Sequence, residues 1–499
     1  MSFPYLSIIV FLPVVGAIII ALIAGGRPRL TRYLAAIFTF IPLVLAVVLF
    51  ANFDRSLAAS AVIQFEEKIA WITPLNAFYH LGVDGLSLPL VLLTAFLGFT
   101  VVLISWKINF RVREYFVWLL LLETSILGVF SSLDLLLFFV FWEIEVIPMY
   151  FLISIWGSGR KEYSAIKYVV YTLFGSALML AGILSIYFTT TPHSLSMVDL
   201  TQGGLVMVQS IMPAAPIFFL LLAGFAVKLP VVPLHTWLPD AHTDAPTAGS
   251  VMLAGALIKM GGYGMIRVCL SIFPQVTRDY SLLLVILAVI GVLYGAALTL
   301  RQTDLKRMIA YSSVSHMGFV LLGIFALGQV SLTGAALQMV SHGLITGLLF
   351  AMAGLVIHNV GERDLRQLGG LARQMPVIAV IFSIAGLGGL GLPMTSGFAA
   401  EFLVFVGSFS STVFNGIQVY TILAVLGVVV AAGYILWMLQ RTFYGPVLEK
   451  YASVKDADIL EKGCMFAFVA LIMLIGIYPA ILTDIIKLGI SPIMGLLGG

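Results

Sequence analysis

The sequence has few charged residues and almost no cysteine. Only 10% of its 499 residues are Asp, Glu, Lys or Arg, while 61% are hydrophobic. A soluble domain has about 25% charged residues. The two cysteines, Cys269 and Cys464, form no CxxC pair or metal-ligand spacing, so the sequence indicates no disulfide framework, zinc site or iron–sulfur cluster. A net charge of +3 is too small to indicate nucleic-acid binding.

Motifs that bind redox cofactors are also missing. The sequence contains no CxxCH, and no GxGxxG follows a predicted strand. The glycine-rich run GLGGLGLP (386–393) lies inside a hydrophobic stretch without a βαβ setting, so it indicates an unwound helix. We therefore expect this chain to bind no metal and no cofactor of its own.

Long hydrophobic runs of about 20 residues recur along the whole chain, which is typical of membrane-spanning helices. The runs do not alternate polar and apolar residues with period two, as a membrane barrel would. The first run, 5–24, has no basic region before it and no small-residue cleavage site after it, so we interpret it as a retained span. The predicted fold is an all-α polytopic membrane protein with about fourteen spans.

The distribution of basic residues supports this count. When the spans are numbered with the N-terminus outside, the inside loops hold 19 Lys and Arg residues and the outside loops hold four. Because inside loops of membrane proteins are enriched in Lys and Arg, this asymmetry predicts a multi-pass protein of the cell (plasma) membrane with both termini on the outer side.

Two of the predicted spans are too long for one straight helix and contain Pro and Gly breaks, at 228–233 and 389–397. Each break falls in the fourth span of a five-span block. Because five is odd, the two blocks enter the membrane from opposite sides, as inverted repeats do. The predicted segments are 1–112 with helices 1–3, 113–275 with helices 4–8, 276–445 with helices 9–13, and 446–499 with helix 14.

Charged residues inside the hydrophobic runs are the main functional signal. An ionisable side chain at the bilayer centre costs at least ~2.5 kcal/mol and is usually functional. Glu143 and Glu145 lie two positions apart, about 200° around a helix, so their carboxylates point to different sides. One can face an internal path and the other a neighbouring helix or subunit. The structural alternative is a set of static ion pairs.

The other candidate carriers lie near the predicted breaks or in glycine-rich helices. Lys228 stands beside Pro230 at the first break, and a carboxylate that moves toward and away from it would change its proton affinity. Lys259 lies among glycines that leave room for water, and Glu401 lies one turn past the second break. A salt bridge with no role in transport is the alternative interpretation for Lys228.

Histidines and further acidic residues form a weaker set of candidates. A neutral histidine both accepts and donates a proton, which suits His316 and His342 to a relay, although a lone buried histidine is often only hydrogen-bonded. His235 and Asp240 could line an entry funnel or cap short helices. Glu123 could belong to the path or to an ion pair. Asp84 is placed to cap the start of a span.

At these residues the chain resembles the M-type chains of bacterial NADH:quinone oxidoreductase, respiratory complex I. The shared motifs cover most of the region 82–402: GVDGLSLPL (82–90), DLLLFFVFWE (134–143), KLPVVPLHTWLPDAHTDAPTAGSV (228–251), LIKMGGYG (257–264), DLKRMIAYSSVSHMGF (304–319) and GLPMTSGFAAEF (391–402). The resemblance implies an antiporter-like, proton-pumping membrane subunit with fourteen helices, two inverted repeats and a central hydrophilic axis.

The resemblance also implies roles for individual residues. Glu143 and Lys228 would be an entry-side pair, Lys259 the central carrier, His316 and His342 the continuation of the axis, and Glu401 the last carrier. NADH, FMN, iron–sulfur clusters and quinone would lie on partner subunits. The expected neighbours are the antiporter-like L- and N-type chains and the lipid bilayer.

Two other functions share this chemistry: a D-type subunit of a multisubunit Na⁺/H⁺ antiporter, and the equivalent subunit of a membrane-bound hydrogenase. A free-standing channel is disfavoured, because channel filters do not need buried lysines. The sequence WEIEV carries a second carboxylate that resembles the plastid-type form of the family. The electron donor of the complex, NADH or another such as ferredoxin, therefore stays open.

Overall fold

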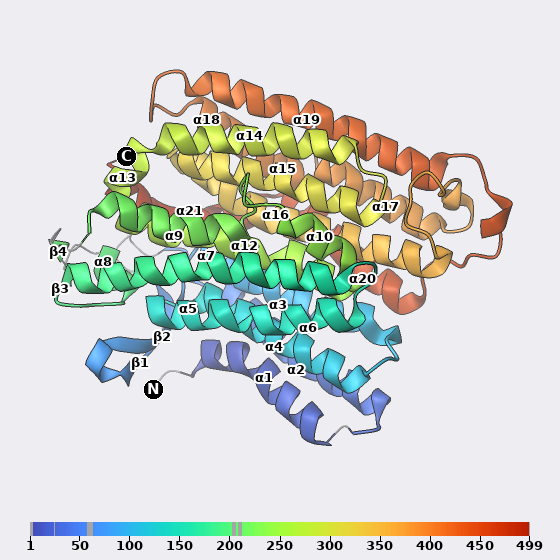
Figure 1. Ribbon diagram of the computed structural model, residues 1–499, viewed down its shortest axis with the longest axis horizontal. Helices are drawn as coiled ribbons and strands as arrows, with labels where there is room; N and C mark the ends of the chain where they lie inside the picture. The colour runs from blue at the N-terminus through green and yellow to red at the C-terminus, as the bar shows by residue number, and fades with distance from the viewer. Residues whose placement is uncertain (1–2, 24, 57–62, 202–205, 208–211, 499) are drawn as a thin grey trace.

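A computed structural model describes residues 3–23, 25–56, 63–201, 206–207 and 212–498 of the chain. The helices lie side by side along the long axis of the molecule (Figure 1). Twelve helices in the described part are long and apolar enough to cross a membrane, and three shorter apolar helices accompany them. The chain is thus a polytopic α-helical membrane protein, as predicted. The number of fourteen crossings and the inverted repeat stay predictions.

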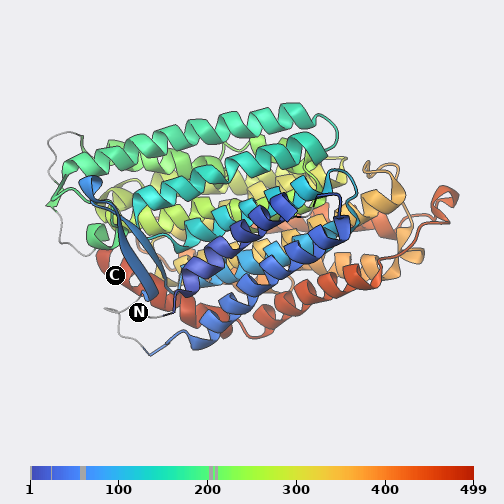
Figure 2. The ribbon, with the colours of Figure 1, turned by 90° about the horizontal axis from the view of Figure 1, so that it is seen from below.

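One end of the bundle carries both chain termini. The same end carries a hairpin of β1 (Gln64–Ile72) and β2 (Ala77–Val83) and the short pair β3 (Thr190–Thr191) and β4 (Val206–Met207) (Figures 1 and 2). We call this end the terminal face and the other end the opposite face. The first hairpin is antiparallel, with Lys68 opposite His80. The sequence did not predict it, because its two strands lie in a loop between two much stronger hydrophobic signals.

The first part of the bundle follows the predicted spans closely. Its helices are α1 (Tyr5–Ile23), α2 (Pro28–Asn52), α3 (Ser87–Ile104), α4 (Val112–Ser131), α5 (Leu135–Ile144), α6 (Val146–Trp156), α7 (Lys161–Thr189), α8 (Met197–Thr201), α9 (Ala214–Lys228) and α10 (Trp237–Asp244). The Asp134 carboxylate caps α5 by accepting from the backbone N–H groups of Leu136 and Leu137. The predicted break after Lys228 is confirmed, because α9 ends there and α10 begins at Trp237.

The helix that carries Lys259 is irregular along its length. It runs as α11 (Thr247–Met252), a π-helical stretch Leu253–Leu257, α12 (Lys259–Gly264) and a second π-helical stretch Met265–Leu270. Such π-bulges occur frequently at functional sites. Gly261 lets the helix approach α9, since a Cβ atom there would lie 2.5 Å from the Phe225 carbonyl oxygen. The helices that carry Lys228 and Lys259 are therefore in direct backbone contact.

The second part of the bundle contains the other predicted break. Its helices are α13 (Pro274–Asp279), α14 (Ser281–Leu300), α15 (Leu305–Phe325), α16 (Gln329–Val360), α17 (Pro376–Gly389), α18 (Ser396–Phe409) and α19 (Ile417–Leu439), which continues as a π-helical stretch Gln440–Tyr444. The gap between α17 and α18 confirms the predicted discontinuity. Asp304 caps α15 and forms an isolated bridge with Asp364, much as Asp134 caps α5 and bridges Ser196. This likeness supports the predicted repeat.

The C-terminal segment differs from the prediction. A single helix was expected within 446–499, but the structure has α20 (Ile459–Ile477) and then a separate α21 (Ala480–Leu496). The chain leaves helical geometry at Tyr478, directly before Pro479. Polar residues such as Asp484 and Lys487 recur along α21, which is why hydrophobicity alone did not reveal it. The helix packs across α16 and α3.

Close contact between α3 and α21 can be tested at Gly85. A Cβ atom at this position would lie 1.9 Å from the Ile485 carbonyl oxygen, so Gly85→Ala must displace one of the two segments. Overpacking of this kind costs about 1–3 kcal/mol. We expect a lower thermal unfolding temperature of the purified membrane protein. The control is Gly463→Ala in α20, where nothing lies within 4 Å; equal stability of both variants would contradict the described packing.

Candidate functional site

The buried charged residues predicted from the sequence lie inside the bundle. Each is at least nine-tenths buried, and they come from several helices: Glu123, Glu145, Lys228, Lys259 and Glu401. Low-dielectric surroundings make an unpaired charge expensive, so each ionised group needs a partner. The partners of these residues therefore indicate which of them act together.

Lys228 is paired with Glu145, not with Glu143. The Lys228 ammonium, at the last residue of α9, contacts the Glu145 carboxylate, which also accepts a hydrogen bond from the Tyr168 hydroxyl. The ammonium further lies 5.5 Å from the centroid of the Trp142 ring and 5.4 Å from that of Tyr168. Cation–π contacts of this kind add to the stabilisation of the buried lysine.

This pairing corrects the prediction that Lys228 is paired with Glu143. The Glu145 carboxylate therefore lies on the Lys228 side, whereas a place for Glu143 on the proton path stays a prediction. Glu143 is only half-buried and lies on the side of the exposed Ile144 and Ile147. It is still near enough to Lys228 to interact electrostatically. The sequence could not show which side of α5 is covered by α7 and α9.

Lys259 is bonded to a histidine of the second part of the bundle. Its Nζ lies 2.8 Å from His342 Nδ1, in α16, and also donates to the Ala254 carbonyl oxygen five residues earlier in the same helix. The π-helical stretch around Ala254 accounts for this carbonyl, because its register frees acceptors from the usual helical bonds. Lys259 thus connects the first part of the bundle to the second.

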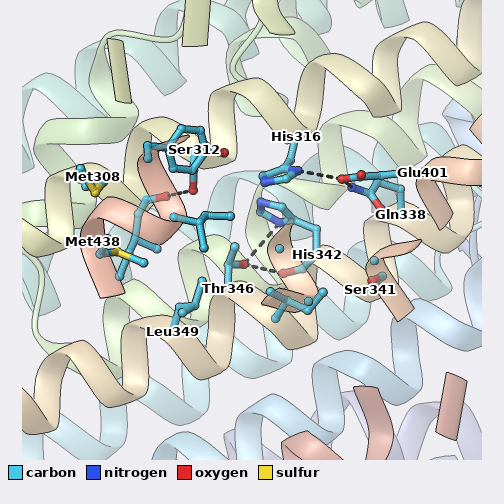
Figure 3. Close-up of a pocket in the computed structure, with 17 residues that line it drawn as sticks. Met308, Ser312, His316, Gln338, Ser341, His342, Thr346, Leu349, Glu401 and Met438 are labelled. Atoms are coloured by element: carbon cyan, nitrogen blue, oxygen red, sulfur yellow. Dashed lines mark hydrogen bonds and ion pairs between the residues drawn. The ribbon is translucent and has the colours of Figure 1, made fainter. Parts of the chain in front are cut away.

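From His342 the polar contacts continue to Glu401. The His342 and His316 rings have centroids 5.5 Å apart, and His316 Nδ1 lies 3.2 Å from Glu401 Oε1 (Figure 3). Gln338 also donates to Glu401, at 3.5 Å. Lys259, His342, His316 and Glu401 therefore lie in a row across α12, α16, α15 and α18, with no direct hydrogen bond between the two rings, and we call this row the relay line.

A small cavity lies along the relay line. It is lined by both histidines and Glu401 together with hydroxyl and amide side chains, and Figure 3 shows these groups turned toward one another. The space suffices for an ordered water, which would find several polar partners there. The Tyr434 hydroxyl of α19 also lines the cavity and has no hydrogen-bond partner among the described residues. A tyrosine in an apolar span gave no signal in the sequence.

The two charged clusters are adjacent but not bonded to each other. Within the described residues, no hydrogen bond joins the Glu145–Lys228 pair to the relay line. The closest link is the backbone contact between α9 and α12 at Gly261. The structure thus brings together four predicted relay residues in one line and places Lys228 with Glu145 in a second cluster beside it.

Predicted residues on α10 and near it lie toward the opposite face. Asp240 is bonded to Lys167 at 2.7 Å and to Arg307 at 3.4 Å, so it connects the two parts of the bundle. His235 is buried and packs against the Tyr294 ring, with centroids 5.5 Å apart. Neither residue touches the relay line in the described structure.

Two buried residues of this region were not singled out as carriers. His242 is fully buried and stacks on Phe350 at 4.8 Å, and neither ring nitrogen has a hydrogen-bond partner among the described residues. Lys306, which the loop assignment placed outside the membrane helices, is buried and donates to the Ala245 carbonyl oxygen at 2.8 Å. The motif PDAHTDAP and the charge of Lys306 were visible, but their burial was not.

Glu123 and Asp84 lie away from the relay line. A Cβ atom at Gly98 would lie 2.2 Å from the Glu123 carboxyl carbon, so that carboxyl group packs directly on α3. No ion pair involving Glu123 occurs in the described part of the chain, so the predicted pairing is not observed there, and a place on the proton path stays a prediction. Asp84 caps α3 by accepting from the N–H groups of Leu86 and Ser87, as predicted, and it also pairs with Arg267.

Similarity to known proteins agrees with this architecture of broken helices and buried lysines. The family model "NADH:quinone oxidoreductase/Mrp antiporter, TM" matches residues 132–427. The chain therefore belongs to this family of antiporter-like membrane subunits. Among its relatives, NADH-quinone oxidoreductase subunit M of Rhodobacter capsulatus is 39% identical, over 96% of this chain and 94% of the relative.

Two further comparisons extend this result. NAD(P)H-quinone oxidoreductase chain 4 1 of Synechococcus elongatus is 40% identical, over 97% of this chain and 90% of the relative. A chain of respiratory complex I from Thermus thermophilus superimposes with a TM-score of 0.86 at 28% identity, covering 99% of this chain and 100% of that one. The similarity thus extends over nearly the whole chain in both sequence and fold.

The pairing of Lys228 predicts the relative effects of two substitutions. Glu145→Gln removes the carboxylate that contacts the lysine, and breaking a buried ion pair costs about 3–5 kcal/mol. Glu143→Gln leaves that contact intact. We expect Glu145→Gln to reduce thermal stability more than Glu143→Gln does, as measured by unfolding of the purified protein. A larger loss with Glu143→Gln would contradict the pairing and restore the sequence-based assignment.

Proposed function

We propose that the chain is a proton-translocating membrane subunit of a complex I-type NADH:quinone oxidoreductase. The observation that carries the proposal is the relay line from Lys259 to Glu401, buried in a chain that belongs to this family. Each group in the line can take up and release a proton, and each is within one side chain or one water of the next. The chain would contribute proton transport and no redox step.

Proton transfer along the line follows from the contacts. The Lys259 ammonium donates toward His342 Nδ1, so a proton can pass to that ring. A water in the cavity would connect His342 to His316, whose other contact is the Glu401 carboxylate. Because Glu401 lies just past the α17–α18 break, its proton would leave near unwound backbone, where water can approach.

The Glu145–Lys228 pair supplies a plausible control point for this transfer. While the carboxylate holds the Lys228 ammonium, the positive charge of that lysine is neutralised. If the pair opens, the uncompensated charge on α9 acts on the neighbouring helix of Lys259, where it favours release of the proton toward His342. The contact of α9 with α12 at Gly261 keeps the two lysines on rigidly connected helices.

The relatives of the chain also support a proposal about its surroundings. We infer a membrane-arm subunit in a multisubunit complex, with antiporter-like L- and N-type chains as neighbours and NADH, FMN, iron–sulfur clusters and quinone on other subunits. The half-buried Glu143, on the side of exposed isoleucines, suits a contact with such a neighbour. We place the chain in the plasma membrane with both termini outside, in line with the loop charges.

Lys259→Ala in the assembled complex tests the proposal. The substitution removes the first donor of the relay line, so we expect this chain's share of proton pumping to be lost while the complex still assembles. Proton uptake by proteoliposomes and the subunit composition of the purified complex are the measurements. Lys455→Ala, at an exposed lysine, is the matched control and should pump normally. Full pumping by Lys259→Ala would refute the relay.

A further inference from the structure

Two further polar residues follow Lys259 on the same helix, toward the terminal face. Tyr263 lies one helical turn after Lys259, and Arg267 lies one turn further, about 12 Å from Lys259 along the helix axis. Arg267 Nε donates to the Tyr263 hydroxyl at 3.3 Å, and its guanidinium lies 5.4 Å from the centroid of that ring. The helix of Lys259 thus carries polar side chains toward the terminal face as well, although Lys259 itself is bonded to His342.

Arg267, the second of these residues, belongs to a buried ion pair. Arg267 Nη2 lies 2.5 Å from Asp84 Oδ2, and 12% of the arginine side chain and 2% of the aspartate side chain are exposed. The other carboxylate oxygen, Oδ1, accepts from Leu86 N–H at 3.1 Å and from Ser87 N–H at 2.9 Å. Asp84 is therefore held by three donors at the start of α3, between the hairpin and the membrane helix.

None of these groups is suited to pass on a proton. A guanidinium stays protonated at any physiological pH and has no acceptor site. The Asp84 carboxylate is held in place by the Arg267 guanidinium and two backbone N–H groups, so it cannot swing toward Lys259. The positive charge of a fixed arginine also repels protons and cations that approach it, as in pores that exclude them.

We propose that the Arg267–Asp84 pair is an electrostatic barrier that prevents protons from leaking between Lys259 and the terminal face. The inference rests on the proposed function, since a leak matters only if Lys259 carries protons. The pair would leave the relay line to Glu401 as the open route from Lys259. It would thereby contribute to the direction of transport without touching the transferred proton.

Passive proton permeation of the idle complex tests the barrier. The whole complex carrying Asp84→Asn together with Arg267→Met is reconstituted into proteoliposomes without electron donor or quinone, and a potassium diffusion potential drives protons inward. The double substitution avoids a buried carboxylate without a partner, which would itself destabilise the fold. We expect a several-fold faster proton influx than in the wild-type complex. The single variant Arg267→Lys, which keeps a positive charge, should show nearly the same proton influx as the wild-type complex.

Two further variants separate a specific leak from general damage. Arg278→Met removes an exposed arginine on the same face and should leave permeation unchanged. Adding Lys259→Ala to the double variant should abolish the extra influx, because the leak passes through that lysine. Wild-type permeation in the double variant would overturn the proposal, and so would a leak that persists without Lys259. Loss of pumping without a leak would also overturn it, by making the pair part of the path.

The outcome is independent of the test of the proposed function. If Lys259→Ala alone pumps fully, the relay fails whatever the permeation of the other variants. If Lys259→Ala stops pumping but the double variant shows the proton influx of the wild-type complex, the relay is supported and the barrier is refuted.

Discussion

The pairing of charged side chains in a low-dielectric interior is the constraint on which this structure depends. A single unpaired charge there would cost a large part of the stability of a folded protein. Two kinds of pair meet this requirement. In one kind both partners can exchange protons, whereas in the other the cation is a guanidinium that cannot. The pairs are Glu145 with Lys228, Lys259 with His342, Glu401 with His316, and Asp84 with Arg267.

Irregular backbone makes room for these pairs. Lys228 ends α9 at a helix break. Lys259 lies between two π-helical stretches, and the first of them contains the Ala254 carbonyl group that accepts a hydrogen bond from Lys259. Next to Glu401, Gly391 has φ of +79°, and a Cβ atom there would lie 2.8 Å from the carboxylate oxygen. A side chain at this position would be strained and would crowd Glu401, so the break both positions the carboxylate and keeps it accessible.

The sequence predicted the features that depend on composition and chain order. Hydrophobic runs, loop charges and prolines were enough for the polytopic helical class and both broken helices. Ionisable residues inside those runs, together with the family resemblance, indicated the set Lys259, His342, His316 and Glu401. It could not predict rotation about a helix axis, which is set by neighbouring helices. For that reason the contact of Glu145 with Lys228 was not predicted, and the burial of His242, Lys306 and Tyr434 was missed.

Local structure at the edges of the hydrophobic runs was also beyond the sequence. The hairpin of β1 and β2 and the amphipathic helix α21 combine polar and apolar residues, so neither gives a strong hydrophobic signal. Both lie at the terminal face, where α21 packs on α3 and the hairpin leads into Asp84. Their positions explain how a loop segment comes to hold one partner of a buried ion pair.

The central claim is that protons pass from Lys259 through both histidines to Glu401. The most direct measurement is the number of protons pumped per electron by the reconstituted complex with His316→Phe, which keeps a ring of similar size but cannot carry a proton. The relay predicts that electron transfer continues, at least in uncoupled membranes, while this chain's share of the pumped protons is lost. An unchanged ratio of protons to electrons in the assembled variant would contradict it.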